Sequence, residues 1–319
     1  MAYEDASARG NAYLGRNTRA AERIAVIGAS GRSGSAVCRL LTVEGHHLIA
    51  VQRRAGSVPL PGLVAEPRIA DLDDPKALAI ALADATVVVN TAHARWTPQV
   101  IAAAPRNARL VLMGSTRRFS RWADPHGDGV RLGEAAFLAS GRSGVMLHPT
   151  LIYSRQGNGD VQRLAALLSR LPVAPLPGGG RSLVQPIHQG DVARCLLAAA
   201  LHHWDGPETM VIAGPEPIAY RDFLRAVAEA AGLDVPRVLE VPAGLLQMMA
   251  PLSAVLPGVP RIDSAQIRRL TEDKAFDIAP MRQRLGVVPI PLGEGLAETL
   301  SPSFPSGEAT TCTPPGTRQ

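Results

Sequence analysis

The sequence predicts an α/β fold, a doubly wound parallel sheet followed by a smaller mixed C-terminal region. Two observations support this prediction. Short runs of β-branched and other apolar residues alternate with amphipathic stretches in the first half of the chain, which is the pattern of repeated βαβ units. The runs are also apolar at successive positions, as expected of parallel strands that are buried on both faces.

Each element follows from this pattern in chain order. Apolar runs predict five parallel strands, at Ile24–Ile27, Leu48–Val51, Thr86–Val89, Leu110–Met113 and Gly144–Leu147. Amphipathic stretches between them predict four helices, at Ser33–Leu41, Asp74–Leu82, Pro98–Ala104 and Leu132–Ala139. After about Pro149 glycine and proline become frequent, and the patterns predict helices at Val161–Ser169, Val192–Leu201 and Tyr220–Ala231. We expect Asp191 to cap the second of these three helices.

The composition excludes several classes of protein. Apolar residues make up 46% of the 319 residues, enough for a large core and too many for a disordered chain. Aromatic residues make up only 4%, too few for the stacking platforms that bind single-stranded nucleic acid. The net charge is +5, but the basic residues are spread without a dense block, so we expect no nucleic-acid partner.

The cysteines and the first residues bear on the compartment. Three cysteines lie far apart, at 38, 195 and 312, without metal-ligand spacing, which is typical of free thiols in a reducing compartment. The first twenty residues lack the apolar core of a signal peptide. We therefore expect a cytoplasmic protein.

A glycine-rich loop follows the first predicted strand and opens the first predicted helix, in the segment Gly28-Ala-Ser30-Gly31-Arg32-Ser33-Gly34. Gly28 allows the tight turn out of the strand, Gly31 lets backbone amides approach a pyrophosphate, and Gly34 lets the helix pack closely. The free amides and the dipole of the helix N-terminus also favour phosphate. The loop therefore predicts a Rossmann-type NAD(P)-binding domain, with Ser30, Arg32 and Ser33 beside the cofactor.

The end of the second strand indicates which cofactor is bound. This strand ends in Gln52-Arg53-Arg54, where an acidic residue would be expected for NAD(H). Arginine suits a 2′-phosphate by charge and by geometry, and Arg32 lies close in sequence to the same site. We expect NADP(H) as the preferred cofactor, with NAD(H) as the alternative. Asp71, at the end of a further strand that runs into Ile69-Ala70-Asp71, is either a contact to the adenine or an exposed loop acid.

Five segments then occur in an order similar to that of the extended and atypical short-chain dehydrogenases/reductases. They are the glycine loop, Asn90-Thr91-Ala92-His93, Gly114-Ser115-Thr116, the stretch from His148 to Tyr153, and the stretch from Gln185 to Asp191. The resemblance covers about Ile24 to Leu300. It is closest to the atypical branch, which includes NmrA-like proteins and the NAD(P)-binding accessory subunit of respiratory complex I. It implies cofactor contacts from Thr91, Ala92 and His148.

The chain departs from this family at its usual catalytic pair, Tyr-x-x-x-Lys. The only lysines are Lys76 and Lys274, and no tyrosine lies four residues before either of them. By register to Glu134, the two positions hold His126 and Val130. The standard proton-transfer mechanism is therefore excluded.

Other polar residues at predicted strand ends are candidates for catalysis. These catalytic candidates are His93, Ser115 and Tyr153, since ligands bind at the carboxyl ends of strands in open α/β sheets. We interpret the segment from Ser115 to Asp128 as a loop over the nicotinamide pocket. Its Arg117, Arg118 and His126 would either clamp an anionic substrate or face solvent. Asp124, His126 and Asp128 on such a loop are weak ligands, so we expect no metal site.

We expect four segments: a flexible N-terminal arm (1–21), an NAD(P)-binding Rossmann domain (22–150), a C-terminal part that completes the sheet and forms the substrate region (151–300), and a disordered tail (301–319). The uncharged stretch 241–260 contains four prolines, which favours a buried lid or a core helix pair over a membrane span and over a membrane-surface or protein-complex contact.

These observations leave three functional hypotheses. The favoured one is an NADP(H)-dependent oxidoreductase that acts on a small carbonyl-type substrate with an unusual proton donor. The second is a non-catalytic NAD(P)-binding sensor or regulatory protein, with a cofactor and no substrate. The third is an assembly or membrane-associated partner protein that uses the uncharged stretch. Neither the substrate nor the oligomeric state follows from the sequence.

Overall fold

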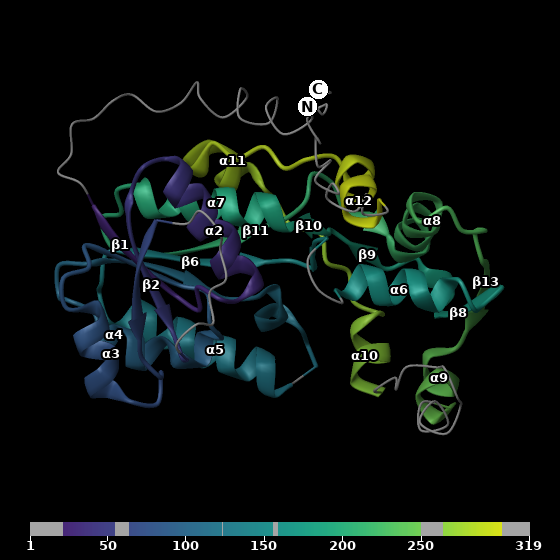
Figure 1. The fold of residues 1–319 in the computed structure, drawn as a ribbon. Coiled ribbons are helices and arrows are strands. Elements are labelled where there is room, and N and C mark those ends of the chain that lie inside the picture. The colour runs from purple at the N-terminus through teal and green to yellow at the C-terminus, as the bar shows by residue number, and fades with distance from the viewer. Residues whose placement is uncertain (1–21, 55–63, 123, 156–158, 250–263, 302–319) are drawn as a thin grey trace, which may run out of the picture.

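The computed structural model describes residues 22–54, 64–122, 124–155, 159–249 and 264–301. A seven-stranded sheet forms its centre, in the order β11-β6-β5-β4-β1-β2-β3, and every strand pair is parallel (Figure 1). The strands are β1 (Arg23–Ile27), β2 (His47–Gln52), β3 (Ala65–Ile69), β4 (Val87–Asn90), β5 (Arg109–Met113), β6 (Gly144–Pro149) and β11 (Pro207–Ile212). The doubly wound α/β fold predicted from the sequence is confirmed.

Helices cover both faces of this sheet (Figure 1). On one face lie α2 (Arg32–Val43), α7 (Gln189–Leu201) and α11 (Ala279–Leu285), which share a buried apolar cluster with the strands. On the other face, a second cluster is formed with α3 (Pro75–Leu82), α4 (Thr97–Ala103) and α5 (Pro125–Ala139). Since both faces are buried, nearly every residue of β1, β2, β4, β5 and β6 is shielded from solvent.

The C-terminal part contributes to two regions. It supplies β11, α7 and α11 to the main sheet, and it forms a smaller region beside the sheet (Figure 1). The helices of that region are α6 (Asp160–Leu168), α8 (Tyr220–Ala230), α9 (Ala243–Met249), α10 (Ser264–Arg269) and α12 (Leu292–Leu300). Short strands pair within it as β7 (Ile152–Tyr153) with β10 (Ile187–His188), β9 (Leu183–Val184) with β12 (Ile218–Ala219), and β8 (Val173–Pro177) with β13 (Arg237–Val241). A third apolar cluster holds α6, α8 and α12 together.

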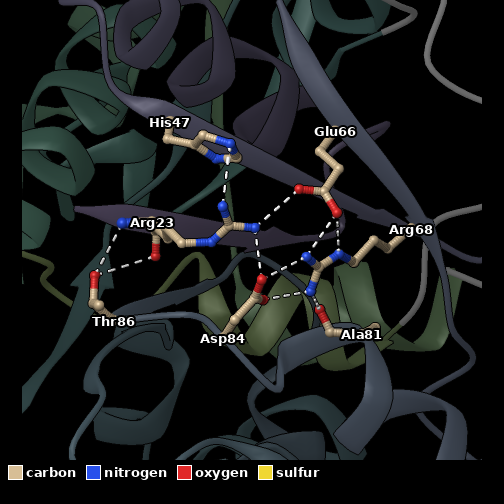
Figure 2. Close-up of polar contacts among 7 residues, drawn as sticks. All are labelled: Arg23, His47, Glu66, Arg68, Ala81, Asp84 and Thr86. Atoms are coloured by element: carbon tan, nitrogen blue, oxygen red, sulfur yellow. Dashed lines mark hydrogen bonds and ion pairs between the residues drawn. The ribbon is translucent and has the colours of Figure 1, made fainter. Parts of the chain in front are cut away.

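A charged network joins the first three strands near their amino ends (Figure 2). Arg68 donates two hydrogen bonds to the Asp84 carboxylate, at 2.6 and 2.9 Å, and a third to Glu66. Arg23 of β1 reaches both of these carboxylates, at 2.6 Å to Asp84 and 3.0 Å to Glu66. The bonds from Arg68 lower the pKa of Asp84 to about 2. The network lies at the amino ends of the strands, whereas ligands bind at the carboxyl ends in sheets of this kind. We therefore interpret its role as structural.

Two strands of the central seven-stranded sheet were not among the predicted apolar runs. The edge strand β3 contains Pro67, which is tolerated because β3 pairs only with β2. Its sequence, Ala-Glu-Pro-Arg-Ile, is polar because one of its sides has no neighbouring strand among the residues that the structure describes. The other strand is β11, which joins the sheet from the C-terminal part.

Two local predictions were wrong. The helix predicted from Leu132 begins seven residues earlier, at Pro125, because Asp124 caps it by accepting bonds from the amides of His126 and Gly127. His126 and Asp128 therefore lie in the first turn of α5 and not on a loop. Asp191 does not cap α7. The cap is His188, whose ring accepts from the amide of Gly190.

Several predictions fall on parts of the chain that are not described. The arm 1–21 and the tail after Ser301 lie outside the described residues. Within the uncharged stretch 241–260, residues 243–249 form α9, and residues 250–260 lie outside the described residues. Among the helices that the structure describes, none is both long and apolar enough to cross a membrane.

Candidate functional site

The candidate site lies where the strand order reverses, at the carboxyl ends of β1 and β4. β1 pairs with β2 on one side and with β4 on the other, so the loops after β1 and β4 diverge and leave a crevice. A cavity of about 210 Å³ opens beside the loops that follow β4 and β5. Its walls come from these loops and from α5, and are Thr91, Ala92, His93, Ala94, Met113, Gly114, His126 and Val130.

The glycine loop is shaped as a cradle. Gly28 has a φ of +78°, a conformation that favours glycine, and a side chain there would also meet the Thr91 hydroxyl. A Cβ on Gly34 would lie 2.7 Å from the carbonyl carbon of Gly28, and closer still to its oxygen. The N-terminus of α2 has no side-chain cap, so its first amides remain available as donors. The predicted roles of Gly28 and Gly34 thus have a geometric basis.

Three buried polar atoms surround this cradle without a hydrogen-bond partner among the described residues. They are Gln52 Oε1 at the end of β2, Asn90 Nδ2 at the end of β4, and Gln189 Nε2 at the start of α7. Gln189 touches the loop directly, since its other side-chain atom accepts from the Ser33 hydroxyl at 3.3 Å. Buried polar atoms are costly without partners, so these three mark places where a polar ligand fits. A dinucleotide therefore suits both the cradle and its surroundings.

The residues predicted to choose the cofactor lie at the rim of the crevice. Arg53 and Arg54 follow β2 and are exposed, as is Arg32 at the first position of α2. Ser30 is exposed in the loop, whereas Ser33 is buried. Asp71 follows β3, is exposed, and accepts a bond from the Asp73 amide, as a turn residue does.

The most informative feature of the cavity is a pair of histidines. The ring nitrogen Nε2 of His93 lies 3.1 Å from Nδ1 of His126, and the rings meet edge to face with centroids 4.3 Å apart. Burial, then the charges of Arg95 and Arg117, lower the pKa of His93 below its ordinary 6.5. The pKa of His126 is lowered as well, again mainly by burial. The two rings are therefore neutral at pH 7.

The loop after β5 positions Ser115 beside this cavity. The Ser115 hydroxyl accepts from the Arg117 amide at 3.2 Å and caps the short 3-10 helix η2 (Thr116–Phe119). Its own amide donates to Nδ1 of His148 at 3.2 Å. His148 is 1% exposed, and its burial lowers its pKa to about 4. His148 thus supports Ser115 from within the protein, so a direct cofactor contact from its side chain is not expected.

Three other predicted site residues, Arg117, Arg118 and Tyr153, are not among the residues that line this cavity. Arg118 forms an ion pair with the buried Glu134, whereas the side chain of Arg117 is 45% exposed. Tyr153 is 2% exposed and belongs to the apolar cluster of the smaller region, and burial raises the pKa of its hydroxyl. Tyr153 does not line the cavity.

The sequence analysis did not identify the C-terminal residues that hold the loop after β5 and the start of α5 in place. Glu272, which follows α10, accepts bonds from the Ser120 hydroxyl and the Arg121 amide, both at 2.8 Å. Arg269 of α10 lies 3.8 Å from Asp124, the cap of α5. These contacts hold the η2 loop and α5 against the C-terminal part. No local signal in the sequence could reveal them, because the partners are about 145 to 152 residues apart.

A larger cavity of about 450 Å³ lies between α8 and β13, lined mainly by arginine, proline and valine side chains. It is remote from the strand ends, and the described residues that line it include no histidine, serine or cysteine. We therefore place the functional site at the smaller cavity.

Comparison with known proteins adds to this geometry. Residues 28–134 match the family described as NAD(P)H-binding. They form an NAD(P)H-binding domain. An uncharacterised protein of Mycobacterium bovis is 28% identical in an alignment of 282 residues, and the match covers 84% of this chain. The chain spans only 28% of the length of that relative.

Solved structures share the fold well beyond the NAD(P)H-binding domain. A nucleoside-diphosphate-sugar epimerase from Pseudomonas aeruginosa superposes with a TM-score of 0.69 at 17% identity, covering 88% of this chain and 97% of that one. An NADPH-dependent quinone oxidoreductase of Escherichia coli, complexed with NADPH, gives 0.68 at 16% identity, covering 86% and 98%. The fold that the predicted resemblance implies is shared with these structures, and the predicted NAD(P)-binding region contains the match to the NAD(P)H-binding family.

Proposed function

We propose that this chain is an NADP(H)-dependent oxidoreductase that reduces a small carbonyl-type substrate. One observation carries the proposal: a cavity lined by two hydrogen-bonded histidines opens beside the glycine cradle, at the strand ends where ligands bind. When bound, the nicotinamide supplies a hydride to the carbonyl carbon. The chain's own residues then hold the cofactor and the substrate and deliver a proton to the carbonyl oxygen.

The preference for NADP(H) rests on charge at the rim. Arg53 and Arg54 stand at the end of β2, and no acid lies there to accept from a ribose 2′-hydroxyl. A charge-assisted bond to phosphate contributes about 1.5–3 kcal/mol, which corresponds to about 10- to 150-fold in affinity. The E. coli quinone oxidoreductase that shares the fold was solved with NADPH, which is in keeping with this choice.

Ser115 and Arg117 are the other two residues that we expect to contact the substrate. The Ser115 oxygen already accepts a backbone bond, so its hydroxyl proton is free to donate to a substrate oxygen. Arg117 is exposed and lies near enough to lower the pKa of both histidines, so it would attract an anionic group on the substrate.

The test is NADPH oxidation, followed at 340 nm, with 9,10-phenanthrenequinone and 4-nitrobenzaldehyde as probes. The wild-type chain should oxidise NADPH faster than NADH at equal subsaturating concentrations. The Arg53→Ala/Arg54→Ala variant should lose that preference by at least about tenfold, while the control Arg237→Ala, on the remote strand β13, should keep it.

A non-catalytic NAD(P)-binding sensor is the second candidate, favoured by the absence of Tyr-x-x-x-Lys from the sequence. Tight NADPH binding without oxidation of either probe would support the sensor and refute the proposed reductase.

A further inference from the structure

The histidine pair is held by two different elements. His93 ends the loop after β4 and caps the short 3-10 helix η1 (Ala94–Trp96). His126 is the second residue of α5, whose start is fixed by the Asp124 cap and by Pro125 at the first helical position. Gly129, one turn along α5, allows the close approach, since a Cβ there would lie 2.8 Å from the His93 ring. The two histidines are 33 positions apart in the sequence, and the fold brings their rings together at the wall of the cavity.

The hydrogen bonds around the pair determine where its protons lie. The backbone amide of Arg95 donates to Nδ1 of His93 at 3.1 Å, so that nitrogen carries no proton. The neutral His93 ring is then protonated on Nε2, which donates to Nδ1 of His126. His126 in turn carries its proton on Nε2. Among the described residues no protein group accepts from that atom, and it is not buried.

The surroundings keep this arrangement neutral. Charged groups that face the two rings come from η1, η2, α10 and the cap of α5, and are Arg95, Arg117, Arg269 and Asp124. Arg95 and Arg117 oppose a positive charge on His93, Arg117 and Arg269 oppose one on His126, and the Asp124 carboxylate favours a positive charge on both rings. A further proton on the pair would also displace the Arg95 amide or the bond between the rings. One N–H donor, that of His126, therefore remains for a ligand in the cavity.

We propose that His126, oriented by His93, is the proton donor to the substrate oxygen. This inference rests on the proposed reductase function. As hydride reaches the carbonyl carbon, the C=O π pair moves to oxygen, which takes the proton from Nε2 of His126. The carbonyl is reduced to an alcohol, NADPH is oxidised, and water returns a proton to the histidine. His93 is a positioning residue, since it fixes which nitrogen of His126 holds the proton.

The inference predicts how the rate of carbonyl reduction depends on pH. Reduction is fastest when the pair carries an extra proton, because an imidazolium gives up its proton more readily than a neutral ring. The rate of reduction should therefore rise as the pH falls through the pKa of the pair, which lies below 6.5.

Long-range ¹H–¹⁵N NMR of the histidine rings tests the geometry without turnover. The expected spectrum has both His93 and His126 protonated on Nε2 at pH 7.5. In His93→Gln, whose side-chain amide can still donate to Nδ1, His126 should keep its Nε2 proton, whereas in His93→Leu the two tautomers should mix. A His126 ring protonated on Nδ1 in the wild-type chain would overturn the inference.

Kinetics with 4-nitrobenzaldehyde tests the proton transfer itself. His126→Gln should lower kcat by about 100-fold or more, because amide protons are not transferred, with the Kd for NADPH unchanged. His93→Leu should lower kcat by about tenfold, and His93→Gln should recover most of that loss. The exposed histidine control His203→Gln should match the wild type.

The outcomes separate the two proposals. No turnover of either carbonyl probe by the wild-type chain would overturn the reductase function and this inference with it. Wild-type turnover that persists unchanged in His126→Gln would overturn the inference alone.

Discussion

The close approach of α2 to the glycine loop gives a sharp prediction for Gly34→Ala. The new Cβ would lie 2.7 Å from the carbonyl carbon of Gly28, about 0.7 Å inside the 3.4 Å at which ordinary contact begins, and 2.9 Å from the Thr91 hydroxyl. That hydroxyl donates to the Ile27 carbonyl at 2.8 Å, so the loop, the helix or the end of β4 must shift. Overpacking of this kind costs about 1–3 kcal/mol. If the strain is relieved by opening the cradle, NADPH binding weakens by about 5- to 100-fold.

The assay is a fluorescence titration of NADPH, with thermal unfolding measured on the same samples. Gly293→Ala is a matched control, because Gly293 also lies in the first turn of a helix and a Cβ there meets nothing within 4 Å. The control should bind NADPH as the wild type does. A Gly34→Ala variant with both wild-type affinity and wild-type stability would refute the close-packed cradle.

Three other variants probe the scaffold and the site. Asp84→Asn removes the carboxylate at the centre of the network in Figure 2 and should lower the free energy of unfolding by about 0.5–1 kcal/mol, roughly 2 °C in Tm. Because the pKa of Asp84 is lowered from 3.8 to about 2, the carboxylate stabilises the fold fully above the unfolded-state pKa. In thermal melts the difference between variant and wild type should shrink as the pH falls through about 2 and vanish below it. Glu134→Gln breaks the ion pair with Arg118 and should lower stability by about 1–3 kcal/mol in urea unfolding, and an unchanged midpoint would contradict a structural role for that pair. Ser115→Ala should lower kcat with the carbonyl probes by about tenfold and leave the Kd for NADPH unchanged, and a loss of cofactor binding would instead assign Ser115 to the cofactor.

The central sheet could be predicted because its physical signal is local. Strands such as Val87–Asn90 are buried on both faces, so their apolar residues occur at successive positions in the sequence. The glycine loop was also accessible, since glycine is demanded at Gly28 by a positive φ and at Gly34 by close packing.

Other elements carried no such signal. The beginning of α5 was misjudged because Gly127, Gly129 and Gly133 lower helix propensity, although a side chain on Gly133 would clash with the Ala94 backbone. The Asp-Pro pair at Asp124 and Pro125 was the available cue. Asp191 was assigned to a cap from its chemistry alone, whereas its carboxylate is used by Arg194 and by the Ile290 amide, 99 residues away.

The histidine pair illustrates the limit most clearly. His93 was a catalytic candidate and His126 a substrate candidate, each from its own position in the chain. Their hydrogen bond depends on the exact start of α5 and on the loop after β4, which only the folded chain brings together. Long-range pairing of this kind cannot be deduced from a single sequence.

The central claim is that this chain binds NADP(H) in the glycine cradle, and the direct measurement is a calorimetric titration of the wild-type chain with NADPH and with NADH at fixed salt. We predict one site that binds NADPH at least about tenfold more tightly than NADH. Heat changes for neither cofactor would contradict the claim.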